Sequence, residues 1–123
     1  MKYKYEIASA DDGRPVIKLQ KELCILEQFL ESEIISQYSG KTVIAKLDEV
    51  ISQKENQLLW WGNIYALDVK KGITRVFNHY LDDDVEKGVQ VDEEYESFIE
   101  SVELRDLLYV WVDEIDKYRT FHS

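Results

Sequence analysis

The chain of 123 residues carries 25 acidic against 15 basic residues, a net charge of −10, and a single cysteine. This balance disfavours binding to nucleic acid phosphates or anionic membranes, which requires clustered Lys and Arg, and one cysteine can form neither an internal disulfide nor a cysteine metal cluster. A content of 45% hydrophobic residues excludes a disordered acidic tail and is typical of a packed globular protein.

The N-terminus and the apolar runs indicate where such a protein resides. Residues 1–9 alternate lysine with aromatic and apolar residues, so they lack the continuous apolar stretch of a signal peptide. No run approaches the roughly 18 apolar residues of a membrane span. We therefore expect a single domain over residues 1–123, located in the cytoplasm.

The first predicted elements are two paired strands. Tyr3, Tyr5 and Ile7 alternate with charged residues over 2–8, the period of two that a half-buried strand has. The sequence "ADDGRP" then predicts a turn in which Gly13 takes a positive φ. Residues 16–20 are expected to return as the second strand of a hairpin.

Two helices are predicted next. Apolar residues recur at intervals of three and four from Leu23 to Ile34, which predicts an amphipathic helix over 22–38 that stops near Gly40. Thr42 is expected to cap a second helix whose apolar positions continue to Ile51.

Residues 58–69 and 73–81 are rich in β-formers and are joined by "KKG", which predicts a hairpin at the centre of the sheet with Gly72 in the left-handed conformation. Trp60 and Trp61 are adjacent in a strand, so their side chains must point to opposite faces. Both faces of this strand are apolar, and the pattern leaves open which tryptophan faces outward. An outward tryptophan is a favoured interface anchor.

The stretch "YLDDDVEKGVQVDEEYE", residues 80–96, holds eight carboxylates and one lysine. Four of its acids fit the spacing of a calcium loop, but Gly88 falls one residue later than the sharp turn of that loop requires. We therefore interpret the stretch as a solvated loop whose charge suits a basic partner. With two aromatic residues added, the candidate partner-binding residues are Asp82, Asp83, Asp84, Glu86, Asp92, Glu93, Glu94, Glu96, Trp61 and Tyr80.

The final elements complete a fold class. Residues 95–100 are a possible edge strand, and Ser101 is expected to cap a last helix with apolar residues spaced by four and three from Leu104 to Tyr118. The order of the elements predicts the α+β class: an antiparallel sheet of four to five strands with about three helices packed on it.

Catalytic chemistry has little support in the sequence. His79 and His122 lack neighbours that suggest a triad or a metal site, and the five glycines are too scattered for a phosphate loop. Cys24 has no nearby histidine and is interpreted as a buried side chain whose role is packing. We expect a protein that is not an enzyme, with no catalytic residues, no bound metal and no cofactor.

The run "WGNIYALDVKKGITRVFNHYLDDD", followed by an acidic segment and the closing helix "LRDLLYVWVDEI", resembles small immunity proteins of bacterial toxin systems, including contact-dependent growth inhibition. The resemblance covers residues 58–118. It implies a cytoplasmic antidote that binds the toxic domain of a secreted or surface-delivered effector, often a nuclease, and blocks its active site. A second, weaker resemblance, through the alternating aromatics at the start and the segment "AKLDEV", is to the YacL family of small bacterial proteins, and it implies no activity.

Three hypotheses follow from these observations. The first is an immunity protein whose acidic surface binds a basic toxin domain, such as an RNase, tRNase or DNase, without contacting nucleic acid itself. The second is an acidic cytoplasmic adaptor or nucleic-acid mimic that binds a basic host protein. The third is a small hydrolase that uses His79, which would require a deep pocket around that histidine.

Overall fold

The computed structural model describes residues 2–122, with side chains over residues 2–120, so the side chain of His122 lies outside the described part. The elements in chain order are β1 (Glu6–Ser9), β2 (Pro15–Lys18), the 3₁₀ helix η1 (Lys21–Leu23), α1 (Cys24–Glu33), α2 (Gln37–Ile51), β3 (Gln57–Trp61), β4 (Tyr65–Lys70), β5 (Ile73–Asn78), α3 (His79–Glu86), β6 (Glu96–Glu100) and α4 (Ser101–His122). The fold is α+β, as the order of the predicted elements indicated.

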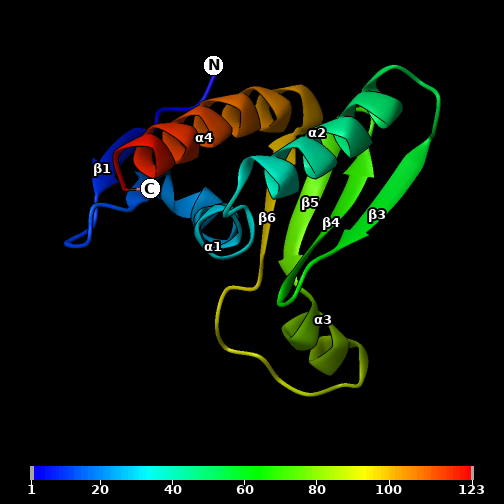
Figure 1. Cartoon of the computed structure of the whole chain (residues 1–123). Coiled ribbons are helices and arrows are strands. Elements are labelled where there is room, and N and C mark those ends of the chain that lie inside the picture. Colours follow the sequence, from blue (N-terminus) through cyan, green and yellow to red (C-terminus); the bar gives the residue numbers. More distant parts are fainter. Residues whose placement is uncertain (1, 123) are drawn as a thin grey trace.

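The strands form two antiparallel sheets. β3, β4, β5 and β6 follow one another in a four-stranded sheet, and β1 and β2 form a separate hairpin. Figure 1 shows α1, α2 and α4 gathered over one face of the larger sheet, while α3 extends beyond one end of it. No helix in the described residues is long and apolar enough to cross a lipid bilayer.

The core lies between the three helices and the inner face of the sheet. Leu67, Val69 and Val76 from the strands are fully buried against Phe29 and Leu47 from the helices. The last helix is anchored by Trp111, whose indole Nε1 donates to the carbonyl oxygens of Leu30 at 3.1 Å and Ile34 at 2.9 Å. The apolar spacing predicted for this helix is confirmed, because Leu104, Leu108, Trp111 and Ile115 are all buried.

The helix predicted over 22–38 is interrupted. α1 ends at Glu33, and Ser36 begins α2 with a capping box that it forms with Ser39. The predictions of a stop at Gly40 and a cap at Thr42 are therefore wrong. Gly40 lies inside α2 where α4 crosses it, and a Cβ there would come within 2.2 Å of Val112 Cγ2.

The central hairpin has three strands rather than two, because the chain turns at Gly62 and separates β3 from β4. Gly13 has a positive φ of 87°, as predicted. Gly72 does not take the predicted left-handed conformation, and its carbonyl oxygen accepts a hydrogen bond from the Ser101 N–H. The edge strand suggested near residues 95–100 is confirmed as β6.

The structure ends β5 and begins α4 at residues that differ from the predicted ones. β5 stops at Asn78 rather than residue 81, because the Asn78 side chain accepts the N–H groups of Tyr80 and Leu81 and starts α3. The acidic stretch thus begins as a helix and not as a loop. Ser101 is the first residue of α4, and its hydroxyl donates to the Lys70 carbonyl oxygen at 2.5 Å.

Candidate functional site

The three covering helices leave the second face of the larger sheet open. The strand register directs twelve side chains to this side, which we call the outer face: Gln57, Leu59, Trp61, Ala66, Asp68, Lys70, Ile73, Arg75, Phe77, Glu96, Phe98 and Glu100. Four large apolar members are about half exposed, with Trp61 at 59%, Phe98 at 53%, Leu59 at 50% and Ile73 at 45%. Exposed apolar side chains grouped on one face are characteristic of interaction surfaces.

The two adjacent tryptophans occupy opposite faces, as strand geometry requires. Trp60 packs against the core, with its ring edge-on to Phe29 at 5.6 Å. Trp61 lies on the outer face and contacts the rings of Phe77 at 6.1 Å and His79 at 5.5 Å. The structure therefore answers the question that the sequence left open, and Trp61 is the outward residue.

Arg75 is the charged centre of the outer face. Its Nη2 donates to Asp82 at 2.6 Å and its Nε donates to Glu96 at 2.7 Å. Its guanidinium lies 4.2 Å from the centroid of the Phe77 ring. Burial alone would lower the pKa of Arg75, but the hydrogen bonds to Asp82 and Glu96 outweigh it and the pKa is raised. One cation thus joins two acids of the acidic stretch.

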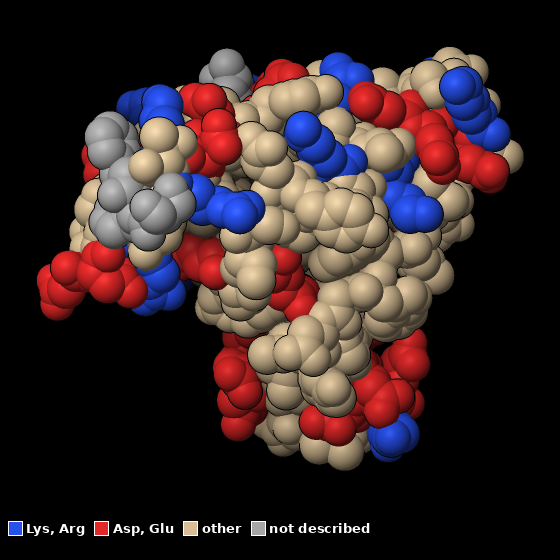
Figure 2. Space-filling view, viewed as in Figure 1, with Lys and Arg blue, Asp and Glu red and all other residues tan. Residues whose placement is uncertain are grey.

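Residues 79–95, which we call the acidic lobe, comprise α3 and the segment that returns to β6. α3 has no buried residues, and it is attached to the sheet through the Asn78 cap, the Arg75–Asp82 ion pair and a hydrogen bond from the His79 N–H to the Ile64 carbonyl oxygen at 3.0 Å. Figure 2 shows the end of the molecule formed by this lobe with Asp and Glu on its flanks. The lobe projects charge away from the core.

The predicted site acids differ in their surroundings. Asp82 and Glu96 are paired with Arg75, and Asp83 forms an ion pair with Lys87 at 2.8 Å. Asp92 accepts a hydrogen bond from Gln90 Nε2. Four carboxylates have no salt bridge and no side-chain hydrogen bond with any residue that the structure describes: Asp84, Glu86, Glu93 and Glu94. Tyr80 is 61% exposed at the start of α3 and stacks beside His79.

Sequence reasoning missed Arg75, which precedes the acidic stretch. The signal was present in the alternation of β5, since Ile73, Arg75 and Phe77 share one face. The partners of Arg75 could not be inferred, because Asp82 reaches it through the start of α3 and Glu96 through the pairing of β5 with β6.

Glu33 is a second residue that sequence reasoning missed. Its carboxylate accepts the backbone N–H groups of Asn63, Ile64 and Tyr65 in the turn between β3 and β4. A Cβ on Gly62 would lie 2.3 Å from Glu33 Oε2. The glycine of the "WGN" sequence is therefore needed so that a carboxylate from α1 can hold the turn that positions Trp61.

His79 is placed as a support for Trp61. Its Nε2 lies 2.9 Å from the Asn63 carbonyl oxygen, and its ring packs edge-on against Trp61. The side chain is half buried, and no carboxylate that the structure describes hydrogen-bonds to it. This arrangement lacks the acid partner that the hydrolase hypothesis requires.

A metal site is not formed by the acidic lobe. Asp82, Asp84 and Glu86 lie on α3, whereas a calcium loop needs an irregular backbone that folds its oxygens around one point. The described residues contain no group of three or more His, Cys, Asp or Glu side chains that could hold a metal ion.

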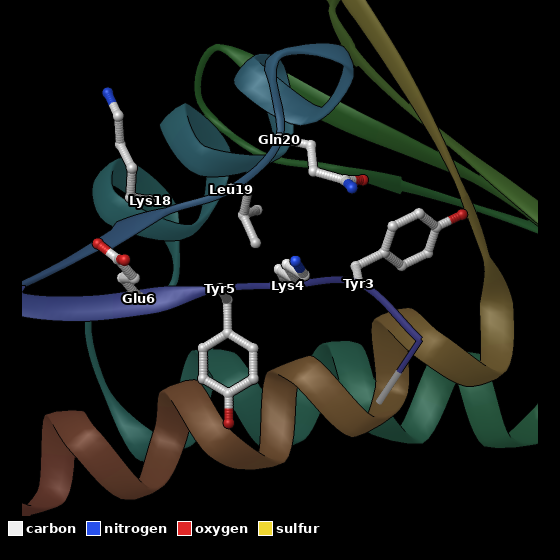
Figure 3. Close-up of a pocket in the computed structure, with 7 residues that line it drawn as sticks. All are labelled: Tyr3, Lys4, Tyr5, Glu6, Lys18, Leu19 and Gln20. Carbon is white, nitrogen blue, oxygen red and sulfur yellow. The ribbon is translucent and has the colours of Figure 1, made fainter.

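A hollow in the surface lies elsewhere, between the N-terminal segment and the end of β2. It measures about 620 Å³ and is lined by Tyr3, Lys4, Tyr5, Glu6, Lys18, Leu19 and Gln20. Figure 3 shows Tyr3 and Tyr5 diverging from the strand, with Tyr3 directed toward β6 and Tyr5 toward α4. The Tyr3 hydroxyl donates to Glu100 and so fastens this segment to the sheet. The candidate site is the outer face with the acidic lobe, because the exposed aromatic residues Trp61, Phe98 and Tyr80 lie there.

Comparison with known proteins adds a family and a relative. A family model described as "Uncharacterised protein family (UPF0231)" matches residues 1–115. A Bacillus cereus protein with the name "Immunity protein" is 29% identical over 119 residues, which cover 97% of this chain and 93% of that protein. No solved structure matches the chain.

Proposed function

The chain belongs to the uncharacterised protein family UPF0231, and on that premise we propose that it is an immunity protein, which binds a toxin domain and neutralises it without catalysis. The observation that carries the proposal is the similarity to the Bacillus cereus protein, because it extends over nearly the whole of both chains. The sheet, the acidic lobe and the last helix are all included in it. The open outer face supports the same proposal, since an inhibitor of this kind works through a surface rather than through a catalytic group.

We propose that the toxin domain contacts the outer face and the acidic lobe together. Trp61, Leu59 and Phe98 offer apolar contact area, and Tyr80 extends it onto α3. The ion pairs of Arg75 hold Asp82 and Glu96 in place on the same side of the sheet. Protein interfaces combine apolar contact area with hydrogen-bonding and charged groups in this way.

The unpaired acids of the lobe point to a basic toxin domain. Asp84, Glu86, Glu93 and Glu94 form no salt bridge with any described residue, so their field acts on an approaching partner. A nuclease active site is basic because it holds phosphates, and carboxylates can occupy the positions of those phosphates. We therefore favour a nuclease, and a toxin delivered from a neighbouring cell as in contact-dependent growth inhibition.

The direct test uses the C-terminal domain of the protein encoded immediately upstream of this chain. That domain is induced in cells with and without the chain, and growth is followed. We expect the chain to restore growth and to co-purify with the domain in a fixed ratio. A domain that arrests growth equally in both strains, with no complex recovered, would overturn the proposal.

The acidic mechanism has its own test with a matched control. The lobe variant carries D84N, E86Q, E93Q and E94Q, which changes the net charge from −10 to −6. The control variant carries E22Q, E49Q, D106N and D116N, exposed acids of η1, α2 and α4, and has the same net charge. We expect the lobe variant to associate with the toxin domain about tenfold more slowly at low salt and to lose most of the salt dependence. Equal effects of the two variants would mean that net charge, and not the lobe, drives association.

A further inference from the structure

β3 is an open edge of the larger sheet. The strand order leaves β3 and β6 at the two borders. β6 is covered, because Tyr3 bonds to Glu100 and the Ile25 N–H donates to Ser97 Oγ at 3.2 Å. Among residues 2–122 no further strand pairs with β3 on its other side, and β3 runs along the border of the molecule in Figure 1.

The backbone groups of three β3 residues point away from the sheet. The Gly62 N–H donates to the Tyr65 carbonyl oxygen at 2.8 Å, which makes these two residues a hydrogen-bonded pair. Pairs alternate along an antiparallel ladder, so Trp60 and Leu58 bond to β4. Gln57, Leu59 and Trp61 consequently direct their N–H and C=O groups to the open edge.

This edge has none of the features that usually prevent strand pairing. Proteins protect edge strands with charged side chains, proline, bulges or a covering element. The sequence of β3 is QLLWW, without charge or proline, and its register with β4 runs residue by residue without a bulge. The edge is therefore competent to pair with a further strand.

We propose that the open edge of β3 pairs with β3 of a second copy of this chain. An antiparallel pair centred on Leu59 places Leu59 opposite Leu59 of the second copy, and Gln57 opposite Trp61. The three outward residues of each strand then satisfy one another's backbone groups, and the two sheets join into one of eight strands. No like charges face each other across this pairing, and the symmetry is the closed twofold that most homodimers adopt.

The charges at the two ends of β3 favour a second copy in this orientation. Lys54, Lys70 and Lys71 lie beside the Gln57 end, although Glu55 lies there too. The Trp61 end lies against α3, through the contact of Trp61 with His79. Antiparallel pairing brings the lysine-bearing end of each copy to the acidic lobe of the other, so the local charges attract although each chain has a net charge of −10.

Pairing through β3 would join the exposed surfaces of the two copies. Leu59 and Trp61 are half exposed beside the edge, and pairing would cover part of each. The outer faces of the two copies would then form one surface. This inference does not depend on the proposed immunity role, because it concerns the chain alone.

The first experiment measures the mass in solution by light scattering over a dilution series. We expect twice 14.6 kDa for the unaltered chain at the higher concentrations and one chain for Leu59→Lys. Leu59→Pro should also give one chain, because proline removes the N–H that points to the second copy and leaves the bonds to β4 intact. Phe98→Lys is the matched control, since Phe98 is equally exposed on the outer face but lies on β6, and it should remain dimeric. A single-chain mass at every concentration, or a dimer that persists in both Leu59 variants, would overturn the proposal.

The second experiment tests the register. Directly paired residues in such a ladder have Cα atoms about 5.5 Å apart, within the range that a disulfide spans. In a Cys24→Ser background, Leu59→Cys should oxidise to a covalent dimer, whereas Phe98→Cys should remain a single chain. Equal cross-linking of the two variants would exclude pairing through β3.

Discussion

The guanidinium of Arg75 on β5 holds the carboxylate of Asp82 on α3 at 2.6 Å, with both side chains three-quarters or more buried. This ion pair joins the acidic lobe to the sheet. It also means that a residue outside the acidic stretch determines where the stretch points.

Replacing Arg75 should release the lobe. Arg75→Gln leaves Asp82 and Glu96 without their cation, and hydrogen bonds to charged groups of this kind contribute about 2 kcal/mol. We expect a loss of that size in urea unfolding and faster amide exchange in α3. Arg14→Gln is the control, because its pair with Asp12 is well exposed and water screens it, so its loss should change the stability much less. Unchanged exchange in α3 would show that the lobe is held in another way.

Replacement by alanine should destabilise the fold more at Trp60 than at Trp61. Trp60→Ala removes a ring that packs against Phe29, and we expect a loss of about 3 kcal/mol in the free energy of unfolding. Trp61→Ala removes an exposed ring, so the loss should stay below about 1 kcal/mol. The measurement is urea unfolding followed by circular dichroism. Equal losses would mean that Trp61 is as much a part of the core as Trp60.

Gly62 and Glu33 should act as one unit. Gly62→Ala places a methyl group on the Glu33 carboxylate, which must move and give up its backbone hydrogen bonds, with an expected loss of about 2 kcal/mol. In a Glu33→Ala background the same substitution should have little effect, because the bonds are already absent. Additive losses in the double variant would contradict this coupling. Gly72→Ala is the control, since no atom lies within 4 Å of the position that its methyl group would take.

Gly40 should be intolerant of any side chain. The Cβ of Gly40→Ala would meet Val112 Cγ2 at 2.2 Å in the contact between α2 and α4, and overpacking of this kind costs about 1–3 kcal/mol. Val112→Ala in the same chain should recover part of the loss by making room. Thermal unfolding of the two single variants and the double variant measures this, and no recovery in the double variant would count against the close contact.

Acid should loosen the N-terminal segment. Hydrogen bonds from Lys2 and then Tyr3 lower the pKa of Glu100 from 4.5 to about 2. A carboxyl whose folded pKa lies below its unfolded value stabilises the fold above the unfolded pKa, and this contribution is lost as the pH falls from about 4.5 through about 2. The titration of the Glu100 carboxyl carbon by NMR checks the pKa.

The hydrogen bond between the Tyr3 hydroxyl and Glu100 supplies a control at high pH. This bond raises the pKa of Tyr3 above 10.0, and burial of the tyrosine is the next cause. Glu100→Gln should therefore lower the pKa of Tyr3 and abolish the acid-dependent change in this segment. A Glu100 carboxyl that titrates near 4.5 would refute the tether.

Much of the fold could be predicted from local patterns. The spacing of Leu104, Leu108, Trp111 and Ile115 predicts α4 because a helix repeats every 3.6 residues, whatever it packs against. Alternation similarly places Trp60 and Trp61 on opposite faces, since the pleat of a strand alone determines it. The turn sequence around Gly13 also predicts its positive φ, and the order of the predicted elements predicts the α+β class.

The candidate site required the tertiary structure. Which tryptophan faces outward depends on the side of the sheet that α1 and α2 cover, and residues distant in the sequence decide that. The sequence predicts a helix stop at Gly40, whereas the structure shows that a glycine is needed there because α4 crosses α2 at this residue. A glycine is needed at position 62 because the carboxylate of Glu33, from another element, lies against it.

The eight carboxylates of residues 80–96 are alike in the sequence, and their number and sign follow from it alone. The pairing of β5 with β6 and the turn into α3 bring two of them to Arg75, while four stay unpaired among the described residues. The reason is physical: charge is a property of each residue, but whether a charge is neutralised depends on what the fold places within a few ångströms of it.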